Sequence, residues 1–141
     1  MRKTLSAMAA LALAAPFLAG CVIVPDAPNV ERTPWQAGTP VPLGQPVEVG
    51  DVVVTPMRVV EDSRCPINAR CVWAGRLIVE TRIDGAGWRD TADITLGEDF
   101  GTHERVVKLT GAQPDKTTQG EIRREQYRFT YEDGTWYVEN E

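Results

Sequence analysis

Histidine, cysteine and serine, which often carry catalysis or bind transition metals, are scarce in this chain. His103 is the only histidine, three cysteines occur in 141 residues, and Ser63 is the only serine beyond Ser6. A structural zinc site usually needs four Cys or His ligands in close pairs. A Ser-His-Asp triad needs a serine held against the histidine. We therefore expect no metal, no cofactor and no catalytic residue.

Clustered basic charge is also lacking. The formal net charge is −5, and the pair Arg123-Arg124 is flanked by Glu121 and Glu125. Binding to a phosphate backbone needs grouped lysines and arginines. The composition thus excludes nucleic acid as a partner.

No hydrophobic run is long enough for a permanent membrane span. The longest, Leu5 to Leu18, has about 14 residues and follows Arg2 and Lys3, whereas a spanning helix needs about 20. A short apolar run after basic residues is typical of a secretory signal peptide, which we assign to residues 1–20. Its cleavage would remove two basic residues and no acidic one, changing the formal net charge from −5 to −7.

The signal ends in LAGC, residues 18–21, which resembles the lipobox of bacterial lipoproteins. That resemblance implies cleavage before Cys21 and its lipidation with acyl chains such as palmitate, two of which anchor a protein stably in a membrane. The alternative is ordinary secretion, which leaves Cys21 as an odd thiol. Val22 stands where aspartate often signals inner-membrane retention, so the resemblance favours the outer membrane of the cell envelope.

Residues 21–42 are predicted to form a lipidated, proline-rich tether. The segment after Cys21 holds five prolines and little apolar periodicity, and such chains favour an extended form of about 3.1 Å per residue. Trp35 is left with two interpretations, as part of the tether or as an arm docked on the domain.

Cys65 and Cys71 remain as an even pair in an oxidising compartment, where disulfides persist. Five residues separate them, whereas a thioredoxin-like redox site has two. A structural disulfide is therefore the favoured interpretation, ahead of a redox pair, a metal site or free thiols.

Beyond residue 42 the dominant hydrophobic period is two, the pattern of half-buried strands. We expect an all-β domain over residues 43–141, a small antiparallel β-sandwich or barrel-like fold of about six to seven strands. Pro56 indicates an edge or a bulge, and the tryptophans are expected to pack in the core or on hairpins. The predicted strands are two around Gly50-Asp51, then 73–83, 88–96, a strand within 103–111, and a hairpin over 125–139 that turns at Asp133-Gly134.

The blocks DSRCP (62–66) and CVWAG (71–75), four residues apart, resemble a motif of an uncharacterised family of bacterial secreted proteins and lipoproteins. The resemblance covers about a quarter of the chain, roughly residues 47–83. It implies a disulfide-stapled β domain and brings no catalytic role with it. Arg76 stands where that motif often has an acidic residue.

The same block yields a hypothesis for binding. We expect the two cysteines to pinch a loop between two strands, Asp62 and Arg64 to pair or cap loop amides, and Trp73 to bury its ring where the next strand begins. Loops on rigid scaffolds commonly carry function. The candidate binding loop consists of Ile67, Asn68, Arg70 and Trp73.

Two function classes follow. The favoured one is a lipid-anchored, non-catalytic cell-envelope lipoprotein, a structural or binding module whose partners are the membrane and an envelope protein or glycan. The alternative is a secreted-type enzyme inhibitor that uses loop 66–70, or a small hydrolase that uses His103 with nearby carboxylates. The acidic segment 96–104 around His103 is interpreted as a solvated loop between strands, because the regular ligand spacing of an EF-hand is absent.

Overall fold

The computed structural model describes residues 30–135. The signal peptide, Cys21, residues 22–29 and the second arm of the hairpin at 136–138 lie outside these residues. Within them the chain is all-β, as predicted, with one turn of 3-10 helix, η1. The elements are β1 Trp35–Gln36, β2 Val47–Val49, β3 Val52–Asp62, β4 Leu77–Gly85, β5 Trp88–Thr95, β6 Asp99–Thr102, β7 Arg105–Gln113, η1 Arg124–Gln126 and β8 Arg128–Asp133.

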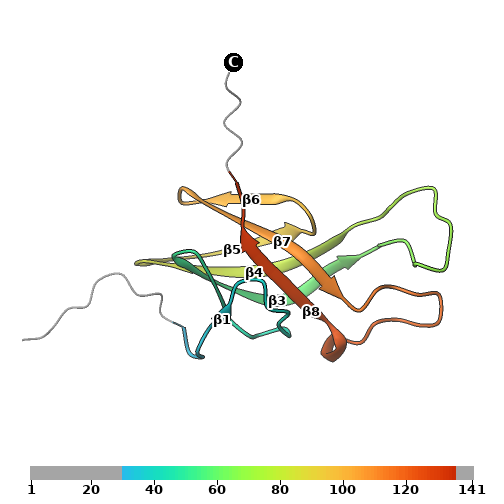
Figure 1. Cartoon of the computed structure of the whole chain (residues 1–141), viewed down its shortest axis with the longest axis horizontal. Coiled ribbons are helices and arrows are strands. Elements are labelled where there is room, and N and C mark those ends of the chain that lie inside the picture. The colour runs from blue at the N-terminus through green and yellow to red at the C-terminus, as the bar shows by residue number, and fades with distance from the viewer. Residues whose placement is uncertain (1–29, 136–141) are drawn as a thin grey trace, which may run out of the picture.

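The strands form two sheets that enclose one core (Figure 1). The larger sheet has the order β1-β2-β3-β4-β5, and the smaller has β6-β7-β8. Every pair of neighbours is antiparallel except β1 with β2. The predicted hairpin over residues 73–96 is present as β4 and β5, joined through the turn at Ala86 and Gly87. Two short strands, β1 and β6, were not expected from the sequence.

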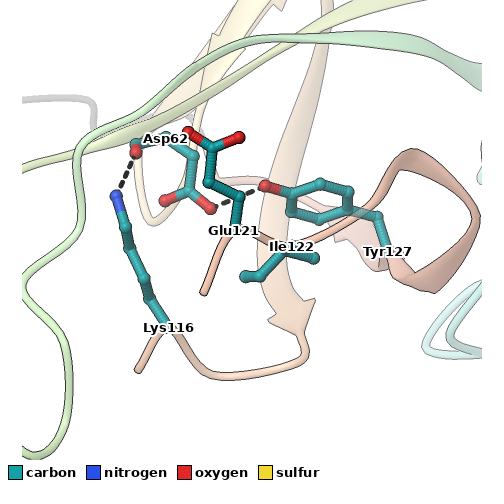
Figure 2. A pocket seen from close by; sticks show the side chains of 5 residues that line it. All are labelled: Asp62, Lys116, Glu121, Ile122 and Tyr127. Carbon is teal, nitrogen blue, oxygen red and sulfur yellow. Dashed lines mark hydrogen bonds between the residues drawn. The ribbon is translucent and has the colours of Figure 1, made fainter. Parts of the chain in front are cut away.

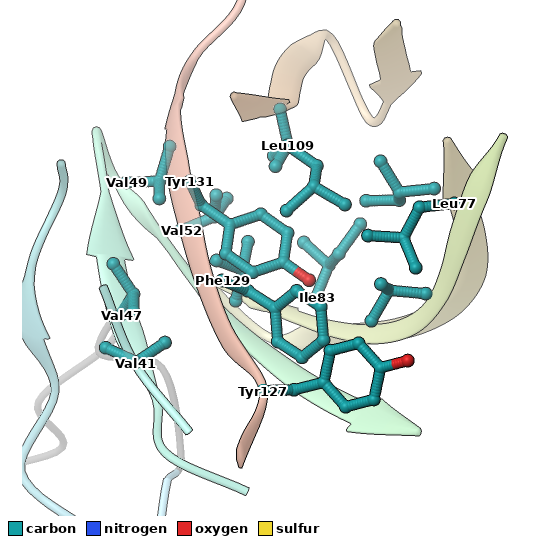
Figure 3. Packing of buried hydrophobic residues seen from close by; sticks show 14 residues of the cluster. Val41, Val47, Val49, Val52, Leu77, Ile83, Leu109, Tyr127, Phe129 and Tyr131 are labelled. Carbon is teal, nitrogen blue, oxygen red and sulfur yellow. The ribbon is translucent and has the colours of Figure 1, made fainter. Parts of the chain in front are cut away.

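Alternation in the sequence decides which side chains fill the core. Along β4, Leu77, Val79, Thr81 and Ile83 are all buried, while the residues between them are partly exposed. Facing them, β8 and the residue before it contribute three aromatic rings, Tyr127, Phe129 and Tyr131, which lie among the aliphatic side chains (Figure 3). Fully burying a side chain such as valine, leucine, isoleucine or phenylalanine stabilises a fold by about 1.5–3 kcal/mol.

The segment before β2 closes one side of the sandwich. Val41 is fully buried and exchanges two backbone hydrogen bonds of 2.9 Å with Phe129 of β8, while the amide of Gly38 donates to the carbonyl of Tyr131. Trp35 forms β1 and docks on β2, although its side chain stays 47% exposed. The domain therefore begins before residue 43, and the predicted tether is too long at its C-terminal end because Val41 supplies core that the sheets need.

Two further expectations need correction. The strand predicted from residue 73 begins at Leu77. The solvated loop predicted over 96–104 contains β6, which pairs with β7 through a turn in which His103 and Glu104 both have positive φ. This pair of left-handed residues matches the twist of a two-residue hairpin, and that geometry is not visible in the residue types His and Glu.

Pro56 lies inside β3, beside a shift in register between Pro56 and Arg58. The predicted bulge is confirmed. The strand is central rather than an edge, since β2 and β4 flank it.

The strands place their connections at the two ends of the long axis (Figure 1). The β3–β4 connection forms the right-hand end, while the β4–β5 turn lies at the left-hand end and β1 in the left half of the molecule. In the part of the chain that the structure describes, no helix has the length and apolarity needed to cross a bilayer.

Candidate binding loop

The segment from Ser63 to Arg76, here called the stapled loop, extends the β3–β4 hairpin beyond its last strand pair. The amide of Ser63 donates to the carbonyl of Arg76 and the amide of Cys65 donates to the carbonyl of Ala74, both at 2.9 Å. The stem of the loop thus continues the antiparallel ladder. Residues 66–73, here called the tip, lie beyond these bonds.

A disulfide between Cys65 and Cys71 closes the tip, with 5.9 Å between the two Cα atoms. The predicted staple is confirmed. Inside the ring the amide of Ala69 donates to the carbonyl of Pro66 at 3.0 Å, which makes a tight turn. The ring therefore fixes the conformation of a segment that has no strand partner.

Gly75 is required where the two arms of the stem approach each other. Its φ is +69°, and a Cβ at this position would lie 1.8 Å from the carbonyl oxygen of Ser63. No other residue type fits this space with that backbone. The last residue of the CVWAG block is thus explained by close packing of two backbones.

Asp62 and Arg64 form a paired anchor under the loop, as predicted. Arg64 Nε and Nη2 donate to the two carboxylate oxygens of Asp62, each at 2.8 Å, and its amide donates to Oδ1 at 3.4 Å as in an Asx turn. Both side chains are almost buried. Arg64 also donates to the carbonyls of Ala112 and Pro114, so the pair ties the loop to the end of β7.

Burial alone would raise the pKa of the Asp62 carboxyl. Hydrogen bonds from Arg64 and Tyr127, with the positive charge of Arg64, outweigh burial and hold that pKa below its usual value. The carboxylate is therefore charged throughout the neutral range. A charged, hydrogen-bonded pair of this kind fixes the direction in which the loop leaves β3.

Lys116 and Tyr127 complete the anchor (Figure 2). Lys116 Nζ donates to the backbone oxygen of Asp62 at 2.6 Å, and the Tyr127 hydroxyl donates to its carboxylate at 2.8 Å. Burial and the bond to Asp62 raise the pKa of Tyr127 to about 12. These groups, with Glu121 and Ile122, line a pocket of about 230 Å³, below the roughly 300–1,000 Å³ of typical small-molecule sites.

A second loop, residues 114–120, supports one side of the tip. The amide of Ile67 donates to the carbonyl of Lys116 at 2.9 Å. Asn68 Nδ2 donates to Thr118 Oγ1 at 2.8 Å, and Asn68 Oδ1 accepts from the Thr118 amide at 3.0 Å. The side-chain amide of Asn68, a member of the predicted binding set, therefore bonds to the neighbouring loop and helps to hold the tip in place.

Three large apolar side chains of the tip point into solvent. Their exposed fractions are 70% for Ile67, 93% for Val72 and 81% for Trp73. The expectation that Trp73 would be buried is wrong, because the ladder stops at Ala74 and the indole lies past the ends of the sheets. Of the other tryptophans that the structure describes, Trp88 packs against the core. Trp35 lies in β1 beside β2, as in the interpretation of a docked arm.

The arginines of the stapled loop differ in their partners. Arg64 pairs with Asp62, and Arg76 pairs with Glu61 at 3.0 Å. Arg70 is exposed and forms no ion pair within residues 30–135. The tip therefore carries one positive charge that no acidic side chain of the described domain offsets.

Ser63 and His103, the two residues that a Ser-His arrangement would need, have different neighbours in the fold. The His103 ring stacks on Trp88 with 4.0 Å between ring centroids. The β6–β7 turn that contains His103 lies toward the left of Figure 1, whereas the β3–β4 connection lies at the right. The Ser63 hydroxyl, at the loop, donates to Glu61 at 2.7 Å. Among residues 30–135, no three or more His, Cys, Asp or Glu side chains are grouped so as to hold a metal ion.

Sequence reasoning missed the supporting residues Lys116, Thr118 and Tyr127. They lie about fifty or more positions from the loop they hold, and no local pattern links such distant positions. The odd placement of Asp62 and Arg64 beside a cysteine was the only available signal that this corner needed a charged anchor.

Comparison with known proteins gave no match of this chain to a family model, to a curated protein or to a solved structure.

Proposed function

We propose that this chain is a lipid-anchored, non-catalytic lipoprotein of the cell envelope that acts as a binding module through the tip of its stapled loop. The signal sequence and the LAGC block support the anchor, and the proline-rich segment supports a tether between anchor and domain. Outer-membrane placement is favoured by Val22 after the lipidated cysteine.

One observation carries the binding role. Ile67, Val72 and Trp73 are exposed on a loop held by a disulfide, a largely buried ion pair and a second loop. Exposing large apolar side chains is unfavourable in water, and a loop without other use would hide or lack them. Loops that are both rigid and exposed are where binding residues usually lie.

The position of the loop agrees with this role. The stapled loop is at the right-hand end of the long axis, whereas β1, which follows the tether, is in the left half (Figure 1). A domain anchored through its N-terminal side would present the tip away from the membrane that holds it. An envelope protein or glycan in the space beyond would be within its reach.

The anchor is tested by fractionating cells that express the full chain or its Cys21→Ala variant. We expect the native chain in the outer-membrane fraction, with an acylated N-terminal Cys21 in the mass spectrum of the mature protein. The Cys21→Ala variant should be unprocessed or soluble. A native chain that begins at another residue, or that carries no acyl group, would contradict the proposal.

The binding role is tested by affinity purification of the full chain from solubilised membranes. Trp73→Ala should lose specific partners that the native chain retains, while Trp35→Ala, which changes an exposed tryptophan in β1, should keep them. Equal recovery from both variants would move the binding surface away from the tip.

A further inference from the structure

We infer that the tip of the stapled loop binds a protein partner whose surface offers an apolar pocket bordered by carboxylates. This inference rests on the proposed function, since it names the chemistry of the partner that the binding module would take. Three features of the tip lead to it: its rigidity, its apolar side chains and the charge of Arg70, which has no ion-pair partner among residues 30–135.

Rigidity comes from contacts on three sides. The disulfide joins the ends of the ring, the stem continues the β ladder, and Asn68 exchanges two hydrogen bonds with Thr118. A surface that is already ordered loses little conformational entropy when it binds. The tip is therefore built to enter a pocket without rearrangement.

The side chains available at the tip favour a protein pocket over a glycan. Trp73, Val72 and Ile67 are apolar, and the side-chain amide of Asn68, the one such amide in the tip, exchanges two hydrogen bonds with Thr118. A sugar needs hydrogen-bonding groups around a stacking ring, whereas a protein pocket buries branched aliphatic side chains beside an indole. Tryptophan and arginine are also the side chains that most often dominate the energy of protein interfaces.

Charge defines the rim of the pocket. The stapled loop, residues 63–76, contains three arginines and no acidic residue in a chain of net charge −5. Two of them, Arg64 and Arg76, are neutralised by Asp62 and Glu61, which leaves Arg70 for a partner. An arginine at the edge of a contact is complemented by a carboxylate, which steers association and fixes orientation.

The experiment places a photoreactive amino acid at Val72 of the full-length, lipidated chain in its native cells, followed by irradiation and mass spectrometry of the adducts. The same group at Ala86 is the control, because Ala86 lies in the exposed β4–β5 turn at the opposite end of the molecule (Figure 1). Membrane fractions of the same cells report the anchor separately.

We expect one discrete protein adduct from position 72 and none from position 86. The cross-linked peptide should come from a partner segment that contains apolar residues and at least one Asp or Glu. Trp73→Ala should lower the adduct yield about thirtyfold, the loss typical of a hot-spot aromatic.

Charge variants test the rim. Arg70→Glu should lower the yield about tenfold or more, and Arg70→Lys should keep it within about twofold, since a lysine keeps the charge. The matched control is Arg32→Glu, which changes the net charge equally but lies before β1. Within the described residues the Arg32 side chain donates a 3.5 Å hydrogen bond to the carbonyl of Gly44. That variant should leave the yield unchanged.

Other products at position 72 would overturn the inference. A phospholipid adduct would make the tip a membrane contact, a peptidoglycan adduct would make it a glycan contact, and an adduct with the same chain would make it a dimer contact. A protein adduct that ignores Arg70→Glu would reject the carboxylate rim while the binding module stands. No adduct in cells whose native chain is membrane-bound would reject the partner while the anchor stands.

Discussion

At the base of the stapled loop, Gly75 combines a left-handed backbone with contact to the opposite arm. An alanine pays about 1–2 kcal/mol for that backbone alone, and its Cβ would also displace the Ser63 carbonyl. We expect Gly75→Ala to lower the free energy of unfolding by more than about 3 kcal/mol, measured by urea denaturation.

Gly87 supplies the matched control for Gly75. Its φ is +75°, but a Cβ there would meet nothing within 4 Å. Gly87→Ala should therefore lose only the cost of the backbone, about 1–2 kcal/mol. Equal losses in the two variants would show that the approach of Ser63 to Gly75 is not tight in solution.

Asp62 makes the stability of the domain depend on acid pH. Its pKa is lowered in the folded chain, so its contribution is complete above the unfolded pKa of about 3.9 and is lost as pH falls through the folded pKa. Asp62→Asn should lower the free energy of unfolding at pH 7 by about 2–3 kcal/mol, because it leaves Arg64 without its charged partner.

Thermal unfolding between pH 7 and pH 2 tests this linkage. The Asp62→Asn variant should show a shallower acid loss than the native chain. Glu61→Gln is the control, since Glu61 pairs with the exposed Arg76 and surface pairs contribute little. Parallel acid profiles for native chain and Asp62→Asn would assign the acid loss to other carboxylates.

At the scale of the element, the β3–β4 hairpin has two independent fastenings. The ladder and the ion pair hold the stem, while the disulfide holds the tip. Replacing both cysteines by serine should cost about 2 kcal/mol, the chain entropy of a ring this small. We expect amide hydrogen exchange to become faster in residues 66–73 and to stay slow in β4. Faster exchange through β4 as well would mean that the disulfide holds the hairpin itself.

Strand boundaries also belong to this scale. Alternation located β4 and β5, because alternate residues of each are more buried than the residues between them. It extended β4 back to Trp73, since the indole continues the apolar pattern in sequence. The pattern could not show that the sheets end at Leu77, nor that His103 and Glu104 turn a hairpin in an acidic segment.

At the scale of the whole molecule, one buried hydrogen bond joins the two sheets. The hydroxyl groups of Thr81 in β4 and Tyr131 in β8 are hydrogen-bonded to each other at 2.8 Å. Thr81→Val would leave the Tyr131 hydroxyl buried without that partner, so we expect a loss of about 1–3 kcal/mol. Adding Tyr131→Phe to Thr81→Val should recover part of the loss, as measured in a double-mutant cycle by urea denaturation.

In contrast to Thr81, Thr55 in β3 has a buried hydroxyl whose removal should stabilise the fold. Its hydroxyl is buried and has no hydrogen-bond partner within the described residues. Thr55→Val should therefore raise the free energy of unfolding by about 1 kcal/mol, because a methyl group carries no desolvation cost. A loss in this variant similar to that of Thr81→Val would show that the two hydroxyls are equally satisfied.

Only part of the candidate site could be predicted from the sequence. The cysteine pair, and the pairing of Asp62 with Arg64, follow from residues close in sequence and from the chemistry of an oxidising compartment. The hydrogen bonds of Asn68 and the exposure of Trp73 were not predicted, because each depends on residues far away in the chain. The side-chain amide of Asn68 is hydrogen-bonded to Thr118, fifty positions away. The aromatic residues of β8 already fill the core in which Trp73 was expected.

By itself the sequence determined the all-β class, the disulfide and most strands, because period-two alternation and cysteine spacing act over a few residues. It is also the only source for the signal peptide and the lipidation of Cys21, which stay predictions. Tertiary structure alone decided which apolar side chains are buried and which are exposed. Burial depends on where two sheets end and on which side chains already fill the space between them, and both are set by contacts between residues far apart in the chain.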